Sequence, residues 1–400
     1  MDFQVIAAII FVLSLIIFLY IKRKEIVTQK ILFPLVYMFL YRTKVGLNLM
    51  DKLSSKHKEL VKLFGYICIG FGFYGMMVIS YIIILMSYNL ISSPETAEAG
   101  ASLVLPFTNI PGIGYLSFFH WIIALFVLAI IHEFAHGVVA RANDIPINSS
   151  GFAFLSILVP IIPAAFVEPD EKKLVKEKPV VQYSVFAAGP IINIIFAFML
   201  LFAFPYVTDA TKLAPFEGEI TEPIGFSFDL TNSTLPATLA GMENGTVVTS
   251  FNNEKLNDSN KFIEYIYHCS KPGETVYFGT DKGDFSFNTA NVDGNSVVGI
   301  NNIKNERRVK TKYENIKGIF YWTKGLIKWL FLLNLFIGLF NLLPLAITDG
   351  GRILKIFLES IMKNKKKADK IWKIISMFFV VLILFSLIVN YIGNPFSLFS

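Results

Sequence analysis

The stretch Leu116–His136, LSFFHWIIALFVLAIIHEFAH, decides how this chain folds and what it binds. It carries no formal charge as far as Ile131 and then presents His132, Glu133 and His136. Ionisable side chains are costly at the end of an apolar span, so they indicate function there. On a helix, positions i and i+4 share one face, so the two imidazoles can reach one metal ion while the glutamate stays free to act on a water molecule. The stretch therefore predicts a membrane-embedded zinc site with hydrolytic chemistry.

The composition excludes an ordinary soluble protein. Of the 400 residues 54% are hydrophobic, and the mean hydropathy is +0.57. The run at 31–41 is apolar but too short to cross a bilayer, and it predicts an interfacial segment.

Two cysteines exclude a disulfide framework. The net charge of +6 comes without the basic and aromatic pattern of nucleic-acid binders, so no nucleic-acid partner is expected. Apolar runs long enough to span a membrane occur at 3–21, 64–91, 115–141, 180–206, 318–347 and 371–392.

The charges between these runs predict a topology. Residues 22–62 carry ten Lys or Arg against three acids, and 352–373 carry eight against two, whereas 207–317 carries eleven against fifteen. The positive-inside rule places the two basic loops in the cytosol. Six spans then alternate, with both termini and 207–317 on the outside. We therefore expect a multi-pass protein of the cell membrane, in contact with lipid, whose histidine pair lies near the cytosolic side.

Composition also divides the chain into parts. The apolar stretch 142–167 is interrupted by glycine and three prolines, so it cannot form a continuous spanning helix. We expect a protein-shielded re-entrant loop or hairpin there, with a partly buried interfacial loop as the alternative. The expected fold class is a polytopic α-helical membrane protein with about six transmembrane helices and an inserted small α+β extracytoplasmic domain. Its parts are an N-terminal span pair with a basic cytosolic loop at 1–112, a membrane core at 113–206, the inserted domain at 207–317, and the second core part with the last span at 318–400.

Asp349 is the best candidate for a third metal ligand. Catalytic zinc needs three protein ligands and one open position. Asp349 lies in Asn341-Leu-Leu-Pro-Leu-Ala-Ile-Thr-Asp-Gly-Gly, where the proline breaks the helix and the glycines permit close backbone approach. The predicted topology places this carboxylate at the same depth as the histidine pair; a helix-ending Asp-Gly-Gly turn without metal is the alternative. His120 lies about four turns from His136 and is interpreted as a structural or lumen-facing residue.

A further pattern, Gly189-Pro-Ile-Ile-Asn193, lies inside the span 180–206. Small residues permit close helix approach, and Asn193 is a polar side chain in an apolar span. Asn193 is either a packing residue or an active-site hydrogen-bond donor that faces the metal and holds the oxyanion or the substrate backbone.

The three patterns together, HExxH in one span, GPxxN in another and NxxPxxxxDGG in a third, resemble the site-2 protease family of intramembrane zinc metalloproteases. The resemblance covers about 115–206 and 318–360. It implies that His132, His136 and Asp349 bind one zinc ion per chain. It also implies that Glu133 is the catalytic base, and that Asn193 and Asn341 lie near the site.

The inserted domain resembles, more loosely, the PDZ domain that such proteases carry between core spans. The match runs from Leu235-Pro-Ala-Thr-Leu-Ala-Gly-Met through a strand to Asn252–Leu256. Pro223–Phe226 is the candidate carboxylate-binding loop. A spacer domain that is not a PDZ domain is the alternative.

The expected function is hydrolysis of peptide bonds in or next to transmembrane segments, in regulated intramembrane proteolysis. The expected partner is a transmembrane protein that another protease has already cut, with the inserted domain restricting access. The alternatives are a membrane-anchored zinc peptidase with other substrates, a polytopic binding or transport protein, and a pseudoprotease. A transporter predicts inverted repeats, which the sequence does not show.

Overall fold

The chain forms two compact units, each with its own core. The structure is a computed structural model that describes residues 3–32, 36–93, 103–110, 113–157, 159–208 and 212–392. Unit 1 comprises Met1–Phe202 and Gly325–Ser400, and unit 2 comprises Ala203–Lys324.

Six helices among the described residues are long and apolar enough to cross a membrane. Their number and approximate positions confirm the six predicted spans, and they fit a polytopic membrane protein. Two of them, α4 and α6, are the most enclosed: 39% and 50% of their apolar windows are buried, against 6% for α1. The polar side chains of His132 and His136 on α4 and of Asn193 on α6 are buried. The six helices are α1 (Phe3–Ile21), α3 (Lys58–Ser92), α4 (Phe118–Ala142), α6 (Pro179–Ala203), α10 (Lys317–Asn341) and α12 (Lys365–Ile392).

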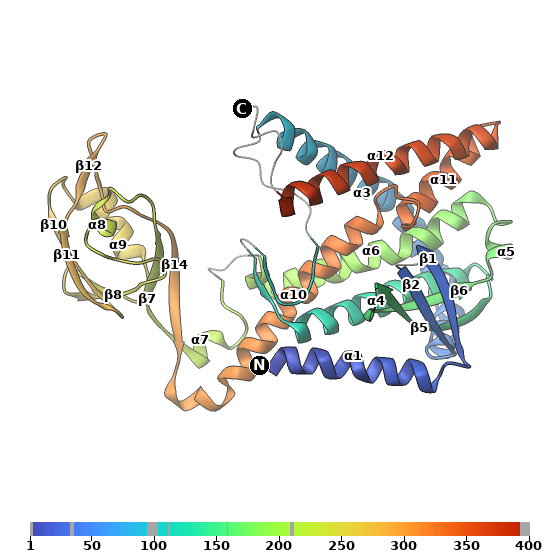
Figure 1. Cartoon of the computed structure of the whole chain (residues 1–400), viewed down its shortest axis with the longest axis horizontal. Coiled ribbons are helices and arrows are strands. Elements are labelled where there is room, and N and C mark those ends of the chain that lie inside the picture. Colours follow the sequence, from blue (N-terminus) through green and yellow to red (C-terminus); the bar gives the residue numbers. More distant parts are fainter. Residues whose placement is uncertain are drawn as a thin grey trace. The chain divides into compact units, whose positions relative to one another are not determined.

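A four-stranded antiparallel sheet lies beside α4 in unit 1 (Figure 1). Its order is β1 (Ile26–Leu32), β2 (Val36–Thr43), β5 (Ile147–Ile157) and β6 (Val159–Pro169). The Pro-broken stretch 142–167 therefore contains a hairpin, one of the two forms expected for it. Within the run at 31–41, for which an interfacial segment was expected, residues 36–41 form part of strand β2. Pairing with β5 satisfies backbone groups that have no partners in an apolar environment.

A polar cluster ties three strands of this sheet together. Arg42 on β2 donates two hydrogen bonds to the carboxylate of Glu168 on β6, at 2.6 and 2.9 Å. Ser149 on the intervening strand β5 donates to the same carboxylate. The hydrogen bond from Arg42 keeps the pKa of Glu168 below its usual range. The pair is partly exposed, so its contribution to stability is about 1 kcal/mol or less.

Short elements complete unit 1. Helix α2 (Leu47–Lys56) packs against α4, and Leu47 and Met50 enter a core with Val139 and Val185. The remaining short elements are β3 (Thr108–Ile110), β4 (Gly114–Leu116), α5 (Glu171–Leu174) and α11 (Asp349–Ile361).

Unit 2 is a small α+β unit built on a six-stranded antiparallel sheet. The order is β11-β10-β8-β7-β14, with β9 paired to β8. Phe226, Phe228 and Phe278 are fully buried in its core. The strands are β7 (Thr221–Leu230), β8 (Val247–Phe251), β9 (Glu254–Lys255), β10 (Thr275–Thr280), β11 (Gly283–Asn288) and β14 (Ile300–Val309), with β12 (Ala290–Val292) and β13 (Asn295–Val297) as a separate pair; the α-helices are α7 (Glu217–Ile220), α8 (Pro236–Leu239) and α9 (Asn260–Glu264).

The candidate carboxylate-binding loop Pro223–Phe226 is not a loop. These residues lie inside β7, where Gly225 pairs with Glu306 and Phe226 pairs with Asn305 of β14. The register shifts between Glu306 and Arg307, beside Pro223. A proline without an amide hydrogen is tolerated at such an irregularity, so it did not mark a loop here.

Candidate metal centre

Three side chains from two distant parts of unit 1 converge on one point. His132 and His136 lie one turn apart on α4, and Asp349 is the first residue of α11. The Nε2 atoms of the two histidines are 3.1 Å apart, and Oδ2 of Asp349 lies 3.1 Å from Nε2 of His132 and 3.3 Å from Nε2 of His136. Ligand atoms around a tetrahedral zinc ion, bonded at about 2.0–2.1 Å, are separated by about 3.3 Å. The triangle therefore has the size of one face of a zinc coordination sphere.

The second ring nitrogen of His136 fixes how this histidine can act. Its Nδ1 lies 2.7 Å from the backbone carbonyl oxygen of Val185 on α6. A carbonyl can only accept a hydrogen bond, so Nδ1 carries the proton and Nε2 of the neutral ring presents its lone pair toward Asp349. Such an outer hydrogen bond is typical of metal-binding histidines. This partner could not be predicted from the sequence, because a backbone carbonyl leaves no pattern in the side chains.

Asn193 on α6 contacts the equivalent nitrogen of His132. Its side-chain amide lies 3.2 Å from Nδ1 of His132, and the side chain is fully buried. The Oδ1 atom of Asn193 has no partner among the described residues. Exchanging the amide nitrogen and oxygen lets Oδ1 accept from Nδ1–H of His132, and the amide NH2 then occupies the position at which no partner lies among the described residues. Asn193 thus contacts His132 through Nδ1, the ring nitrogen that does not contact Asp349.

Gly189 lies directly against the two histidine rings, and its lack of a side chain leaves room for them. A Cβ atom at this position would lie 2.6 Å from Cε1 of His136 and 2.8 Å from Nε2 of His132. Non-bonded contacts are favourable only at about 3.5–4.0 Å between carbon atoms. The sequence suggested that this glycine permits helix approach in general. The structure shows that the approach is to the two imidazoles themselves.

The turn between α10 and α11 brings Asp349 to the histidines. Helix α10 ends at Asn341, before Pro344, and α11 begins at Asp349 after the cap residue Thr348, whose hydroxyl accepts from the Gly351 amide at 3.2 Å. Added Cβ atoms at the two glycines after Asp349 would collide with the backbone of the Leu342–Leu345 segment. The proline break and the close glycine approach are therefore both present as predicted.

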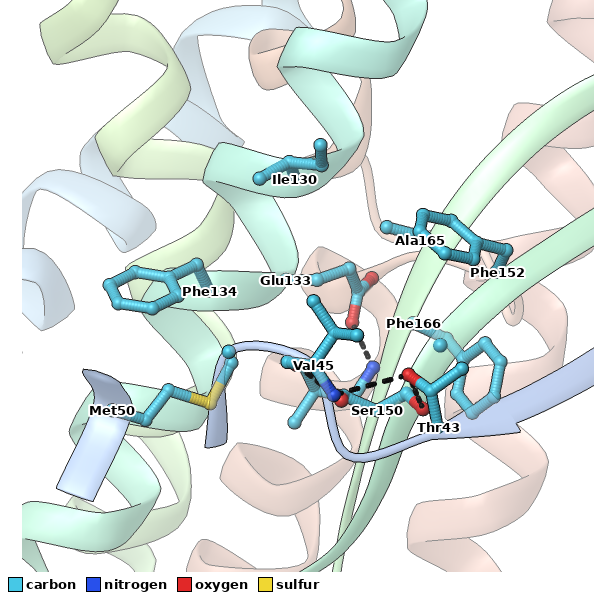
Figure 2. A pocket seen from close by; sticks show the side chains of 13 residues that line it. Thr43, Val45, Met50, Ile130, Glu133, Phe134, Ser150, Phe152, Ala165 and Phe166 are labelled. Carbon is cyan, nitrogen blue, oxygen red and sulfur yellow. Dashed lines mark hydrogen bonds between the residues drawn. The ribbon is translucent and has the colours of Figure 1, made fainter. Parts of the chain in front are cut away.

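The Glu133 carboxylate, on the same helix as the two histidines, contacts the sheet. Its Oε2 accepts a hydrogen bond of 2.9 Å from the Val167 amide on β6 (Figure 2). Because β6 is the last strand in the sheet order, this bond joins the glutamate to a strand edge. Glu133 is thus positioned next to the histidines but does not share their ligand group.

His120 and Asn341, which were also considered from the sequence, are not part of the metal-ligand cluster. His120 lies in the first turn of α4, twelve residues or about 18 Å before His132, and packs against the position of Gly325. Asn341 ends α10 and is half-buried; among the described residues no hydrogen bond joins it to the three ligands.

Comparisons with known proteins show which sequences this chain is similar to. The model of the family described as Peptidase family M50 matches residues 120–385, a range that includes the three clustered side chains and Asn193. An uncharacterized protein of Methanocaldococcus jannaschii is 26% identical over 349 residues, which cover 84% of this chain and 82% of that protein. A protein of Nostoc sp. (strain PCC 7120), named provisionally as a zinc metalloprotease, is 27% identical over 192 residues, which cover 41% of this chain and 50% of that protein.

Proposed function

This chain belongs to peptidase family M50, and we propose that it is a zinc metalloprotease that cleaves transmembrane proteins in or next to their membrane-spanning segments. The observation that carries the proposal is the convergence of His132, His136 and Asp349 inside a bundle of apolar helices. The distances between the two Nε2 atoms and Oδ2 of Asp349 are close to those between ligand atoms around a zinc ion, and Gly189 leaves the space beside them free of a side chain. These residues fit a zinc ion in chemistry and in size, with one ion per chain.

The catalytic roles follow from the side chains. A zinc ion bound here would acidify a water molecule and polarise the scissile carbonyl. Glu133 acts as the general base: its carboxylate takes a proton from the attacking water and returns it to the leaving amine. The Val167 amide holds this carboxylate in place.

Asn193 acts as a positioning residue for His132. Its contact with Nδ1 of His132 orients the ring and leaves Nε2 free to bind metal, as the carbonyl of Val185 does for His136. The contact with His132 supports this positioning role, whereas the sequence left open a packing role and an active-site donor role for Asn193.

Substrates must unwind before they are cut. The amides and carbonyls of a transmembrane helix are already paired with one another. The edge of β6 beside Glu133 offers backbone partners for an extended segment, so the substrate adds as a strand at that edge.

Unit 2 selects substrates and performs no chemistry. We propose that it is a PDZ-like domain on the extracytoplasmic side, which admits substrates whose large outer domain has already been removed by another protease. Its six-stranded antiparallel sheet with short helices and the acidic balance of 207–317 support this assignment.

The test is cleavage by the purified protein in liposomes. The substrate is a single-span peptide labelled at both ends, and the control is E133Q. Cleavage inside or beside the span, absent in E133Q, is expected. Cleavage of a soluble peptide only, or transport without cleavage, would refute the proposal.

A further inference from the structure

A small apolar cavity lies beside Glu133. Its volume is about 120 Å³, and Figure 2 shows the Glu133 carboxylate at its wall. Three parts of unit 1 line it: α4, the β5–β6 hairpin, and the segment 43–50, which runs from the end of β2 into α2. The lining side chains that the argument uses are Met50, Ile130, Phe134, Phe152 and Ala165.

The outer edge of β6, beside the cavity, determines which backbone groups an extended substrate segment could pair with. In an antiparallel pair, alternate residues turn their backbone groups toward the partner strand and away from it. The Val167 amide bonds to Glu133, so the backbone groups of Ala165, two residues earlier, also point away from β5. Pro163, two residues earlier again, has no amide hydrogen. Between these two positions, Ala165 offers an outward amide and carbonyl at the wall of the cavity.

We propose that this cavity binds the side chain of the substrate residue immediately after the scissile bond and selects leucine, isoleucine or methionine there. The inference rests on the proposed function. Glu133 returns its proton to the leaving amine, and that amine belongs to the residue after the scissile bond. The side chain of this residue therefore lies nearest to Glu133 and to the cavity that Glu133 lines.

The size and chemistry of the cavity set the preference. One water-sized group takes up about 30 Å³, and a cavity of about 150 Å³ accommodates benzene. A volume of about 120 Å³ therefore holds roughly four side-chain heavy atoms, as in leucine, isoleucine and methionine, and excludes an indole ring. An acidic side chain is disfavoured because it would be placed beside the Glu133 carboxylate.

One wall comes from outside the family match. The segment 43–50 precedes residue 120, where the match begins. Met50 is 3% exposed, and its Sδ lies 2.6 Å from where a Cβ on Gly137 of α4 would be, so glycine lets it pack directly on the α4 backbone. The N-terminal part of the chain thus contributes to the specificity of the site.

The test varies one residue of a single-span peptide. Cleavage of a leucine peptide is first mapped by mass spectrometry, and the residue after the mapped bond is then changed to Ala, Ile, Met, Phe, Trp, Asp or Lys. The wild-type protein is expected to cleave the Leu, Ile and Met peptides with kcat/KM at least about 10-fold above the Ala, Trp, Asp and Lys peptides. A flat profile, or a preference for Trp or Lys, would overturn the assignment.

Two variants test the cavity directly. A165L fills it and should reverse the preference toward Ala, whereas A164L, with the same change on the opposite face of β6, should keep the wild-type profile. M50A enlarges it and should raise relative cleavage of the Phe peptide, which decides the matter if A165L does not fold. Unchanged profiles in folded variants that still cleave would refute the cavity assignment alone. A wild-type protein that binds zinc and cleaves none of the peptides would instead refute the proposed function.

Discussion

Replacing Gly189 by alanine should weaken zinc binding without unfolding the protein. The added Cβ would lie 2.6 Å from Cε1 of His136 and 2.8 Å from Nε2 of His132. Nε2 of His136 would lie closer still, so one ring or the α6 backbone must move by roughly 1 Å to reach a separation of about 3.5 Å. Zinc-ligand distances tolerate only about ±0.2 Å, so both histidines cannot remain bonded at their original positions.

The size of the effect follows from the cost of overpacking. An extra methyl group in a packed interior typically costs about 1–3 kcal/mol. If this strain is relieved mainly by displacing the imidazoles, zinc affinity should fall roughly 5- to 150-fold, since about 1.4 kcal/mol is a factor of ten. Cleavage at limiting zinc should fall by a similar factor.

The assay is competition for zinc between the purified protein and a chelator of known affinity. G70A is the matched control, because Gly70 is exposed on α3 and its added Cβ has nothing within 4 Å. G70A should bind zinc as the wild type does. A G189A protein with wild-type zinc affinity would refute the packing argument and the position of the metal.

The remaining predictions concern three other parts of the protein. E133Q should abolish cleavage yet retain zinc, because Glu133 is a base outside the ligand triangle and glutamine can still accept from the Val167 amide; loss of metal would mean that the roles are misassigned. N193A should lower zinc affinity about 10–100-fold, and N193D, which still accepts from Nδ1 of His132, should restore most of it; an oxyanion-donor role predicts normal zinc binding in N193A and no rescue by N193D. Replacing 213–310 with a flexible linker should leave cleavage of a short peptide intact and increase cleavage of a substrate with a large outer domain; unchanged discrimination between the two would place selection inside the membrane.

Much of the site could be predicted because its residues leave patterns in the sequence. The i, i+4 spacing of His132 and His136 survives in any helix, and the charge asymmetry of the loops placed Asp349 at a matching depth. The helix break at Pro344 followed from proline chemistry alone.

Other features depend on contacts between distant segments, and the sequence could not show them. An apolar run at 31–41 has the same composition whether or not part of it forms a strand, and only the pairing of residues 36–41 with β5 shows that it does. The partner of Asn193 depends on which face of α6 meets α4. The bond between Glu133 and Val167 joins a helix to a strand that the sequence suggested only as a possible hairpin.

The most direct test is a zinc titration of cleavage. The protein is stripped with a chelator, returned to liposomes with the labelled single-span peptide, and supplied with measured amounts of zinc. Cleavage should be absent in the stripped protein, rise in proportion to bound zinc, and stop rising at one ion per chain, while D349A should neither hold that ion nor cleave. Cleavage by the stripped protein, or a D349A variant that binds zinc and cleaves normally, would contradict the assignment of His132, His136 and Asp349 as the catalytic metal centre.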